Sequence, residues 1–301
     1  MKTFSTRSSY TRHPMFVRSL LLATVIVWGS TFVATKICLA YLTPAEILTL
    51  RLLLAMPVLF GLIVLQKIKP RFTPAEKRRL LIGSGVFTLH FLIQITGMQY
   101  TSATNTGWII SVTPLILVIL SHFILKERIR INDVVGVVAA TAGILVLMSR
   151  GDFSSLGWLA SPGDWLVLVS AHTWAVYTIV GRDLSRSHNP IGVAFAFLLP
   201  ATIVMTLYVG LTSDWSRFVH LPLEPLVALL FLGIVAMGIA NWWWQKGVAS
   251  IGAAKAGTFL YIEPLATTLL AVPILHETVN VFTFAGGFMV LCGVYWAQRR
   301  K

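Results

Sequence analysis

Two ionisable side chains interrupt the long apolar segment 254–275, where an isolated charge would be expensive to place inside a bilayer. Glu263 lies about eight residues into the segment, roughly 12 Å deep at 1.5 Å per residue. It is either a protonatable or cation-recognising group beside a pathway, or a structural carboxyl that is hydrogen-bonded across helices. Lys255 either extends to the aqueous surface or faces a cavity and meets a substrate carboxylate. The two lie about 80° apart around a helix, so each needs its own partner.

Polar and aromatic side chains of other apolar segments recur at helical spacing. Trp174 and Tyr177 share one helical face, as do His90 and Gln94. Such groups either hold helices together or line a pathway. The candidate substrate-binding residues are Trp28, His90, Gln94, Asn105, Trp108, Trp174, Tyr177, Asn241, Lys255 and Tyr261. Glu263 is the candidate proton-coupling residue.

Two prolines lie inside apolar segments and are candidate hinges, Pro114 and Pro264. Proline removes one backbone hydrogen bond of a helix, so Pro264 frees the carbonyl of Leu260. We therefore expect both segments to bend at their prolines, although membrane helices tolerate proline generally.

Two further cations lie near the ends of apolar segments. Arg51 follows Glu46 closely, and we interpret it as structural, paired with that carboxylate or bonded to backbone carbonyls. Lys36 is interpreted as extending to the aqueous surface.

Motifs for metal binding, nucleophilic catalysis and nucleotide binding are absent from the sequence, including HExxH, GxSxG, Walker A and GxGxxG. The cysteines, Cys38 and Cys292, both lie in apolar runs and form no CxxC pair. We expect no catalytic residue, no metal and no cofactor, and hence no enzyme. A membrane-embedded enzyme acting on a lipid phosphate would need clustered Asp or His residues at the membrane edge.

The segment that carries Lys255 and Glu263 is one copy of an internal repeat. Shifting Ala253–Thr278 back by 150 positions aligns it without gaps to Ala103–Arg128, with eight identities in 26 positions. Composition alone would give roughly two or three. Gly107 matches Gly257, Pro114 matches Pro264, and the final acidic residue of each copy also matches. The chain is therefore a duplicated unit.

Composition assigns this duplicated unit to the membrane. Of 301 residues, 56% are hydrophobic and only 12% are charged, about half the charge of a soluble domain. A span needs about 20 mostly apolar residues. The expected spans are 19–35, 45–65, 80–98, 102–125, 134–148, 165–180, 191–211, 226–245, 254–275 and 281–296.

The lysines and arginines predict the orientation of these spans. Nineteen of them fall on one side and only Arg150 and Arg217 on the other, which places both termini in the cytoplasm. The net charge of +13 therefore reflects membrane orientation rather than binding of nucleic acid. Each half has an odd number of spans, so the two repeats are inverted, as in many transporters.

We expect an all-α membrane protein of ten transmembrane helices, built as two inverted five-helix repeats with both termini cytoplasmic. The expected divisions are a cytoplasmic tail 1–18, the first repeat 19–149, an external connector 150–164, the second repeat 165–297 and a basic tail 298–301.

Several motifs resemble the EamA domain of the drug/metabolite transporter superfamily. They are Trp28–Phe32 (WGSTF), its second-half counterpart Ala171–Tyr177 (AHTWAVY), and the proline-to-glutamate ends of the repeated segment, Pro114–Glu127 and Glu263–Glu277. The resemblance covers about residues 20–297 and implies a ten-span carrier that often exports amino acids or other small metabolites. It does not identify the solute.

We therefore expect a secondary transporter in the inner (plasma) membrane that exports small amphipathic metabolites by alternating access. The expected partners are a small-molecule solute and the lipid bilayer, with the chain acting as a monomer or a homodimer. A channel or a non-transporting receptor is the alternative, since alternating access leaves no sequence signature. Proton coupling and transport direction stay open.

Overall fold

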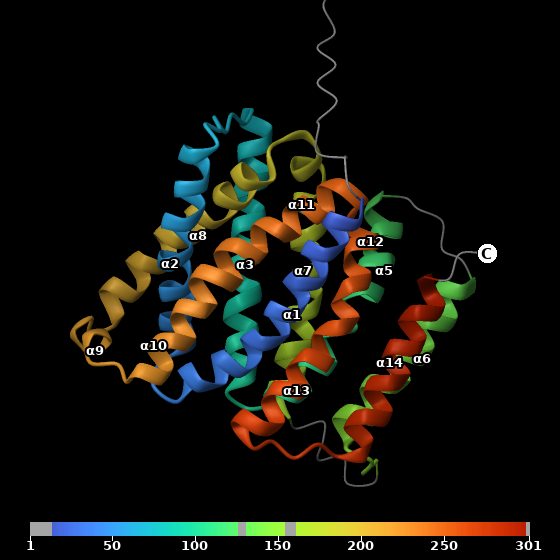
Figure 1. Ribbon diagram of the computed structural model, residues 1–301. Coiled ribbons are helices and arrows are strands. Elements are labelled where there is room, and N and C mark those ends of the chain that lie inside the picture. Colours follow the sequence, from blue (N-terminus) through green and yellow to red (C-terminus); the bar gives the residue numbers. More distant parts are fainter. Residues whose placement is uncertain (1–13, 126–130, 154–160, 299–301) are drawn as a thin grey trace, which may run out of the picture.

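The computed structural model describes residues 14–125, 131–153 and 161–298, and across these ranges it contains helices and no strand (Figure 1). Five helices are long and apolar enough to cross a membrane, and shorter apolar helices accompany them. The described chain is thus an all-helical, multi-pass membrane protein.

The described part of the first half contains six helices: α1 (Pro14–Leu39), α2 (Pro44–Leu65), α3 (Pro74–Met98), α4 (Ala103–Ile110), α5 (Thr113–Leu125) and α6 (Ile131–Ser149). The second half begins with α7 (Pro162–Ser187), α8 (Pro190–Thr212), the short α9 (Ser216–Val219) and α10 (Leu223–Leu230). It continues through a π-helical stretch (Phe231–Ala240), α11 (Asn241–Ile251), α12 (Ala253–Gly257), a 3₁₀ turn (Thr258–Ile262), α13 (Glu263–Leu275) and α14 (Val281–Gln298).

Several helices extend beyond the spans expected from hydropathy. α1 begins at Pro14, inside the expected tail, and α7 begins at Pro162, inside the expected connector. Capping boxes begin α2 and α3: in α2, Thr43 N–H donates to Glu46 Oε2 at 2.8 Å, and Glu46 N–H donates to Thr43 Oγ1 at 3.3 Å. Such caps are sequence signals that hydropathy does not register.

The two copies of the repeated segment are broken helices. In the first copy the break falls at Ser111–Val112, between α4 and α5, and in the second it is the 3₁₀ turn between α12 and α13. Pro114 and Pro264 are each the second residue of the helix that follows the break. A proline is well tolerated there, because the first turn of a helix has no backbone acceptor for that N–H.

The helices of the two halves pack against one another. α3 lies along α7, α2 along α8, α1 along α13, and α6 along α14 at one edge of the bundle (Figure 1). Glycines allow the last contact, since a Cβ on Gly143 would come within 2.6 Å of Gly286 O.

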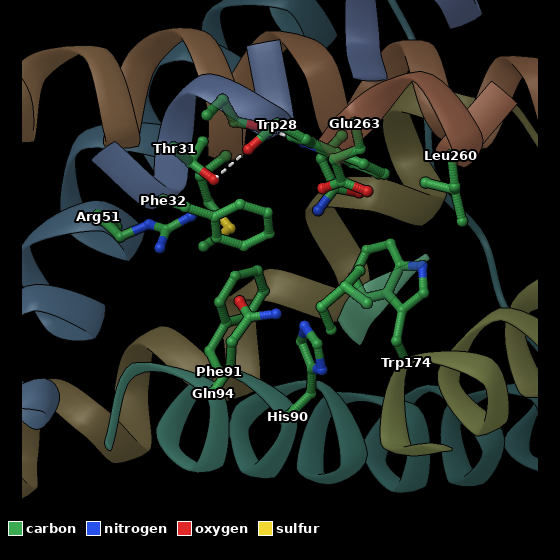
Figure 2. A pocket seen from close by; sticks show the side chains of 14 residues that line it. Trp28, Thr31, Phe32, Arg51, His90, Phe91, Gln94, Trp174, Leu260 and Glu263 are labelled. Carbon is green, nitrogen blue, oxygen red and sulfur yellow. Dashed lines mark hydrogen bonds between the residues drawn. The ribbon is translucent and has the colours of Figure 1, made fainter. Parts of the chain in front are cut away.

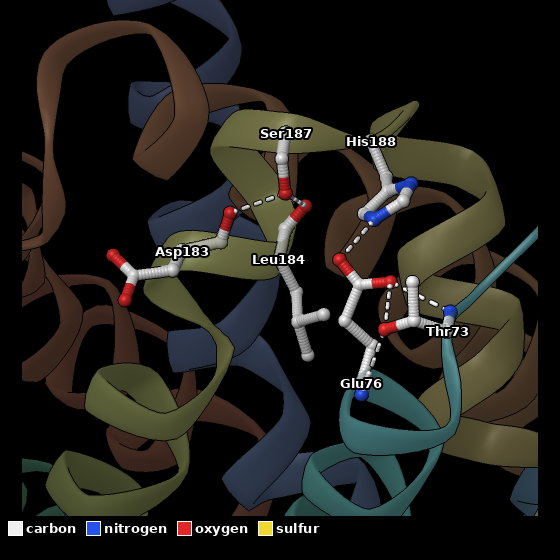
Figure 3. A network of polar contacts seen from close by, with 6 residues as sticks. All are labelled: Thr73, Glu76, Asp183, Leu184, Ser187 and His188. Carbon is white, nitrogen blue, oxygen red and sulfur yellow. Dashed lines mark hydrogen bonds and ion pairs between the residues drawn. The ribbon is translucent and has the colours of Figure 1, made fainter.

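Polar contacts join the halves at both ends of the bundle. At the end carrying residues 66–73, His188 Nε2 lies 2.8 Å from Glu76 Oε1 (Figure 3). Hydrogen bonds from His188 and then from Thr73 lower the pKa of Glu76 to about 2. At the end carrying residues 40–43, Glu277 accepts the N–H groups of Ala103 at 2.7 Å and Thr104 at 2.9 Å, and so caps α4.

Candidate functional site

A cavity lies between the two halves (Figure 2). The free space between its side chains amounts to about 510 Å³ when the part open to solvent is counted. It is lined by Trp28, Thr31, Phe32, Arg51, His90, Phe91, Gln94, Ile110, Trp174, Ala236, Met237, Asn241, Leu260 and Glu263. Six of the candidate residues named from the sequence are among them: Trp28, His90, Gln94, Trp174, Asn241 and Glu263.

The tryptophans of the two matching motifs, Trp28 and Trp174, meet at the cavity. The ring centroids of Trp28 and Trp174 are 5.1 Å apart with the planes at 89°, an edge-to-face contact. Trp28 Nε1 donates to Ala236 O at 3.3 Å, which fixes the indole against the π-helical stretch. Trp244 closes the cluster from behind, with its centroid 5.1 Å from that of Trp28. The result is a fixed aromatic wall built by both halves.

His90 and Gln94 lie one helical turn apart on α3 and extend toward the cavity (Figure 2). His90 Nδ1 is 2.9 Å from Ser170 O, and because a carbonyl only accepts, Nδ1 carries the proton and donates. The other ring nitrogen, Nε2, is then an acceptor for a donor in the cavity. The contact also ties α3 to α7.

Glu263 is the first residue of α13, and its side chain is only 4% exposed. Its Oε2 has no hydrogen-bond partner among the described residues. The backbone beside it is tightly packed: a Cβ on Gly29 would lie 2.5 Å from Glu263 O, and Thr267 Oγ1 lies 3.0 Å from Gly29 O. The carboxyl group therefore occupies a fixed position with an unused acceptor at the cavity.

Arg51 lies about two turns into α2, lines the cavity, and is only 3% exposed. Its Nε has no hydrogen-bond partner, and no described carboxylate lies within ion-pair distance of the guanidinium. Phe91 packs against it, with the ring centroid 4.7 Å from Cζ. The expected ion pair with Glu46 is not formed, because that carboxylate caps α2 at Thr43 instead.

The π-helical stretch contributes Ala236 and Met237 to the cavity, and Asn241 follows it directly. Asn241 is buried, and its Oδ1 has no hydrogen-bond partner in the described chain. Single-turn π-helical insertions are frequent at functional sites because they turn side chains out of the regular α-helical register. Here the wider helix brings Ala236 and Asn241 to the same cavity.

Asn105, Trp108, Tyr177 and Tyr261 are not among the residues that line the cavity. Asn105 is buried in the first turn of α4, and Trp108 packs on α14, 6.3 Å from Phe284 between ring centroids. Tyr177 lies behind Trp174 and accepts a hydrogen bond from Gln245 at 2.8 Å. Tyr261 belongs to the 3₁₀ turn, and the side chain of Lys255 lies outside the described residues.

Some cavity residues that were not among the candidate binding residues carried a usable signal in the sequence. Thr31 and Phe32 follow Trp28 at i+3 and i+4, the spacing of one helical face. Arg51 is an ionisable residue inside an apolar segment, which is itself a reason to suspect a functional site. Phe91, Ile110, Ala236, Met237 and Leu260 are apolar and carry no such signal.

Known proteins resemble this chain over almost its whole length. An "Uncharacterized transporter" of Archaeoglobus fulgidus is 29% identical and covers 94% of this chain and 97% of its own. The "Uncharacterized transporter YyaM" of Bacillus subtilis is 24% identical, covering 93% of this chain and 92% of its own. A "Probable amino-acid metabolite efflux pump" of Salmonella typhimurium is 24% identical and covers 92% of both chains.

The fold is shared with a solved crystal structure that is 20% identical in sequence. The TM-score is 0.70, and the match covers 94% of this chain and 98% of the other. The sequence profile of the EamA-like transporter family matches twice, over residues 15–149 and 161–298, once for each half. These matches confirm the resemblance of the motifs, and the chain belongs to the EamA-like transporter family of multi-pass membrane transporters.

Proposed function

We propose that the protein is a secondary carrier that exports small amphipathic metabolites, with amino acids as the preferred class. The observation that carries this proposal is the cavity between the halves, to which both halves contribute an aromatic side chain and in which Glu263 has an unused acceptor. Apolar and aromatic walls with a few placed polar groups are typical of small-molecule sites. The name of the Salmonella relative points to the same class of solute.

Alternating access is the mechanism we propose for this carrier. The two halves are inverted repeats of five spans each, with both termini cytoplasmic in the inner membrane, as the distribution of lysine and arginine indicates. Each half then rocks against the other around the cavity. The breaks before Pro114 and Pro264 support this mechanism, and we propose that they are the points at which the two repeats bend.

Glu263 has two roles available in such a cycle. It binds the ammonium group of the solute, or it exchanges a proton and couples transport to the pH gradient. Glu263→Gln separates these roles, because a neutral amide weakens solute affinity at every pH in the first case. In the second case it keeps solute exchange and loses acceleration by the gradient.

Counterflow in proteoliposomes tests the carrier. Vesicles loaded with an unlabelled amino acid are expected to accumulate the same labelled amino acid transiently, which a channel does not do. Trp174→Ala should reduce this flux by about 10-fold or more, because an aromatic anchor of the cavity is removed. Trp215→Ala, at a tryptophan outside the cavity, is the matched control.

Two results would contradict the proposal. Folded protein that shows no counterflow with any amino acid or related metabolite would remove the carrier and favour a receptor. Flux without counterflow would indicate a channel.

A further inference from the structure

The arginine at the cavity needs an anion that the described chain does not supply. An arginine side chain stays protonated under all ordinary conditions, and burying an unpaired charge is strongly unfavourable. Arg51 is buried, its Nε is unpartnered, and no described carboxylate pairs with it. The Phe91 ring at 4.7 Å offsets only part of this cost.

Acceptors without donors lie on another wall of the same cavity. Glu263 Oε2 and Asn241 Oδ1 are both buried, and neither has a hydrogen-bond partner in the described part of the chain. Figure 2 shows Arg51 and Glu263 entering the space from different sides, with the aromatic rings between and below them. The cavity therefore offers a donor site, an acceptor site and an apolar surface.

We infer that Arg51 binds the carboxylate of the solute, while Glu263 and Asn241 receive its ammonium group. An apolar or aromatic side chain of the solute then lies against Trp28 and Trp174, which already form an edge-to-face pair. The planar guanidinium matches a carboxylate with two parallel hydrogen bonds, which a lysine cannot do. This inference rests on the proposed transport of amino acids and selects zwitterionic α-amino acids within that class.

A short ligand series removes the carboxylate and the ammonium group from the solute in turn. The ligands are L-phenylalanine, L-phenylalaninamide, which lacks the carboxylate, and 3-phenylpropionate, which lacks the ammonium group. Binding is measured on the purified full-length protein by calorimetry. Each analogue should bind about 10- to 100-fold more weakly than phenylalanine, the range expected for losing a hydrogen bond to a charged group.

Variants of the protein should reproduce the losses seen in the ligands. Arg51→Gln should lower the affinity for phenylalanine to that for phenylalaninamide, and it should leave the affinity for phenylalaninamide unchanged. Glu263→Gln should lower the affinity for phenylalanine to that of the wild type for 3-phenylpropionate. Arg51→Lys keeps the charge without the paired geometry, and it should restore part of the preference for the carboxylate.

Lys36→Gln removes one positive charge outside the cavity lining and controls for long-range electrostatics. Equal binding of phenylalanine and its amide to the wild type would overturn the inference without using any variant. So would a loss of carboxylate preference in Lys255→Gln but not in Arg51→Gln. If the wild type shows no counterflow of amino acids but binds 3-phenylpropionate through Arg51, the proposed function fails and the anion site stands.

Discussion

The broken helices of the two halves satisfy the same backbone carbonyl in different ways. Pro114 and Pro264 cannot donate to the carbonyls of Ile110 and Leu260, which are equivalent positions of the repeat. In the first half, the hydroxyl of Thr113 donates to Ile110 O at 2.6 Å. In the second half, the 3₁₀ turn brings the backbone N–H of residue 263 onto Leu260 O.

The difference determines which side chain is available for chemistry. Thr113 is occupied by its own backbone, whereas the equivalent Glu263 leaves an oxygen unpartnered at the cavity. The residues whose carbonyls are involved, Ile110 of the first copy and Leu260 of the second, both line the cavity with apolar side chains. Duplication thus supplied a symmetric scaffold, and a change at one position made the site asymmetric.

Replacing Glu263 by the residue of the other half should give the largest effect. Glu263→Thr removes the carboxylate and is expected to lower amino-acid counterflow by about 10- to 100-fold, the loss of a hydrogen bond to a charged group. The protein should unfold at the same or a higher temperature, because a buried charge without a partner is destabilising. Counterflow and thermal unfolding are measured on the same preparation.

The reciprocal variant at the first break is the control. Thr113→Val leaves Ile110 O buried without its donor, so it should reduce the free energy of unfolding by about 1–3 kcal/mol and spare transport. Wild-type counterflow in Glu263→Thr would show that the asymmetry at this position has no part in transport.

The glycines of the two copies predict a second, smaller difference. A Cβ on Gly107 would lie 2.8 Å from Thr267 Oγ1, whose hydroxyl is held at Gly29 O and Glu263 O. Gly107→Ala should therefore reduce the free energy of unfolding by about 1–3 kcal/mol through overpacking. On Gly257 the nearest atom is the movable Cδ1 of a leucine at 3.2 Å. Gly257→Ala should cost less than half as much in the same unfolding assay.

Equal losses in the two alanine variants would contradict the comparison. They would mean that the helix crossings at the two breaks are equally tight. A larger loss of unfolding free energy in Gly257→Ala than in Gly107→Ala would mean that the tighter helix crossing lies in the second copy, opposite to the prediction.

The sequence predicted much of the scaffold because duplication and hydropathy are properties of the chain itself. The offset between Pro114 and Pro264 located both breaks, and the matching motifs predicted that Trp28 and Trp174 would both lie at the cavity. The family resemblance was confirmed over both halves. The cap at Thr73 is readable from the sequence, yet hydropathy alone placed the start of α3 six residues too late, at 80 instead of Pro74.

The rest of the site depends on helix rotation and on contacts between distant segments. Trp108 and Tyr177 are as aromatic as Trp174, but packing against α14 and Gln245 turns them away from the cavity. The π-helical stretch shifts the register ahead of Asn241, and no spacing in the sequence indicates such a shift. Arg51 was assigned to Glu46 by proximity along the chain, whereas the fold engages that carboxylate as a helix cap.

Glu76 is the opposite case to Glu263, a carboxylate with several partners, and it should give the smallest effect. Hydrogen bonds from His188 and Thr73 lower its pKa from the ordinary 4.5 to about 2 (Figure 3). A carboxyl group whose pKa is lowered by folding stabilises the fold fully above its ordinary pKa. This contribution is lost as the pH falls from 4.5 toward about 2.

Glu76→Gln should therefore lower the unfolding temperature slightly at neutral pH, and the gap from wild type should close between pH 4.5 and about 2. His188→Ala should weaken this pH dependence, since the hydrogen bond from His188 is the largest single cause of the shift, and leave the part that Thr73 provides. Glu224→Gln, at an exposed glutamate in the first turn of α10, controls for general charge effects. A gap that stays constant over this pH range would mean that Glu76 holds the two halves together by shape alone. In that case the negative charge of Glu76 would not stabilise the fold, and this feature would no longer distinguish it from the unpartnered carboxylate of Glu263.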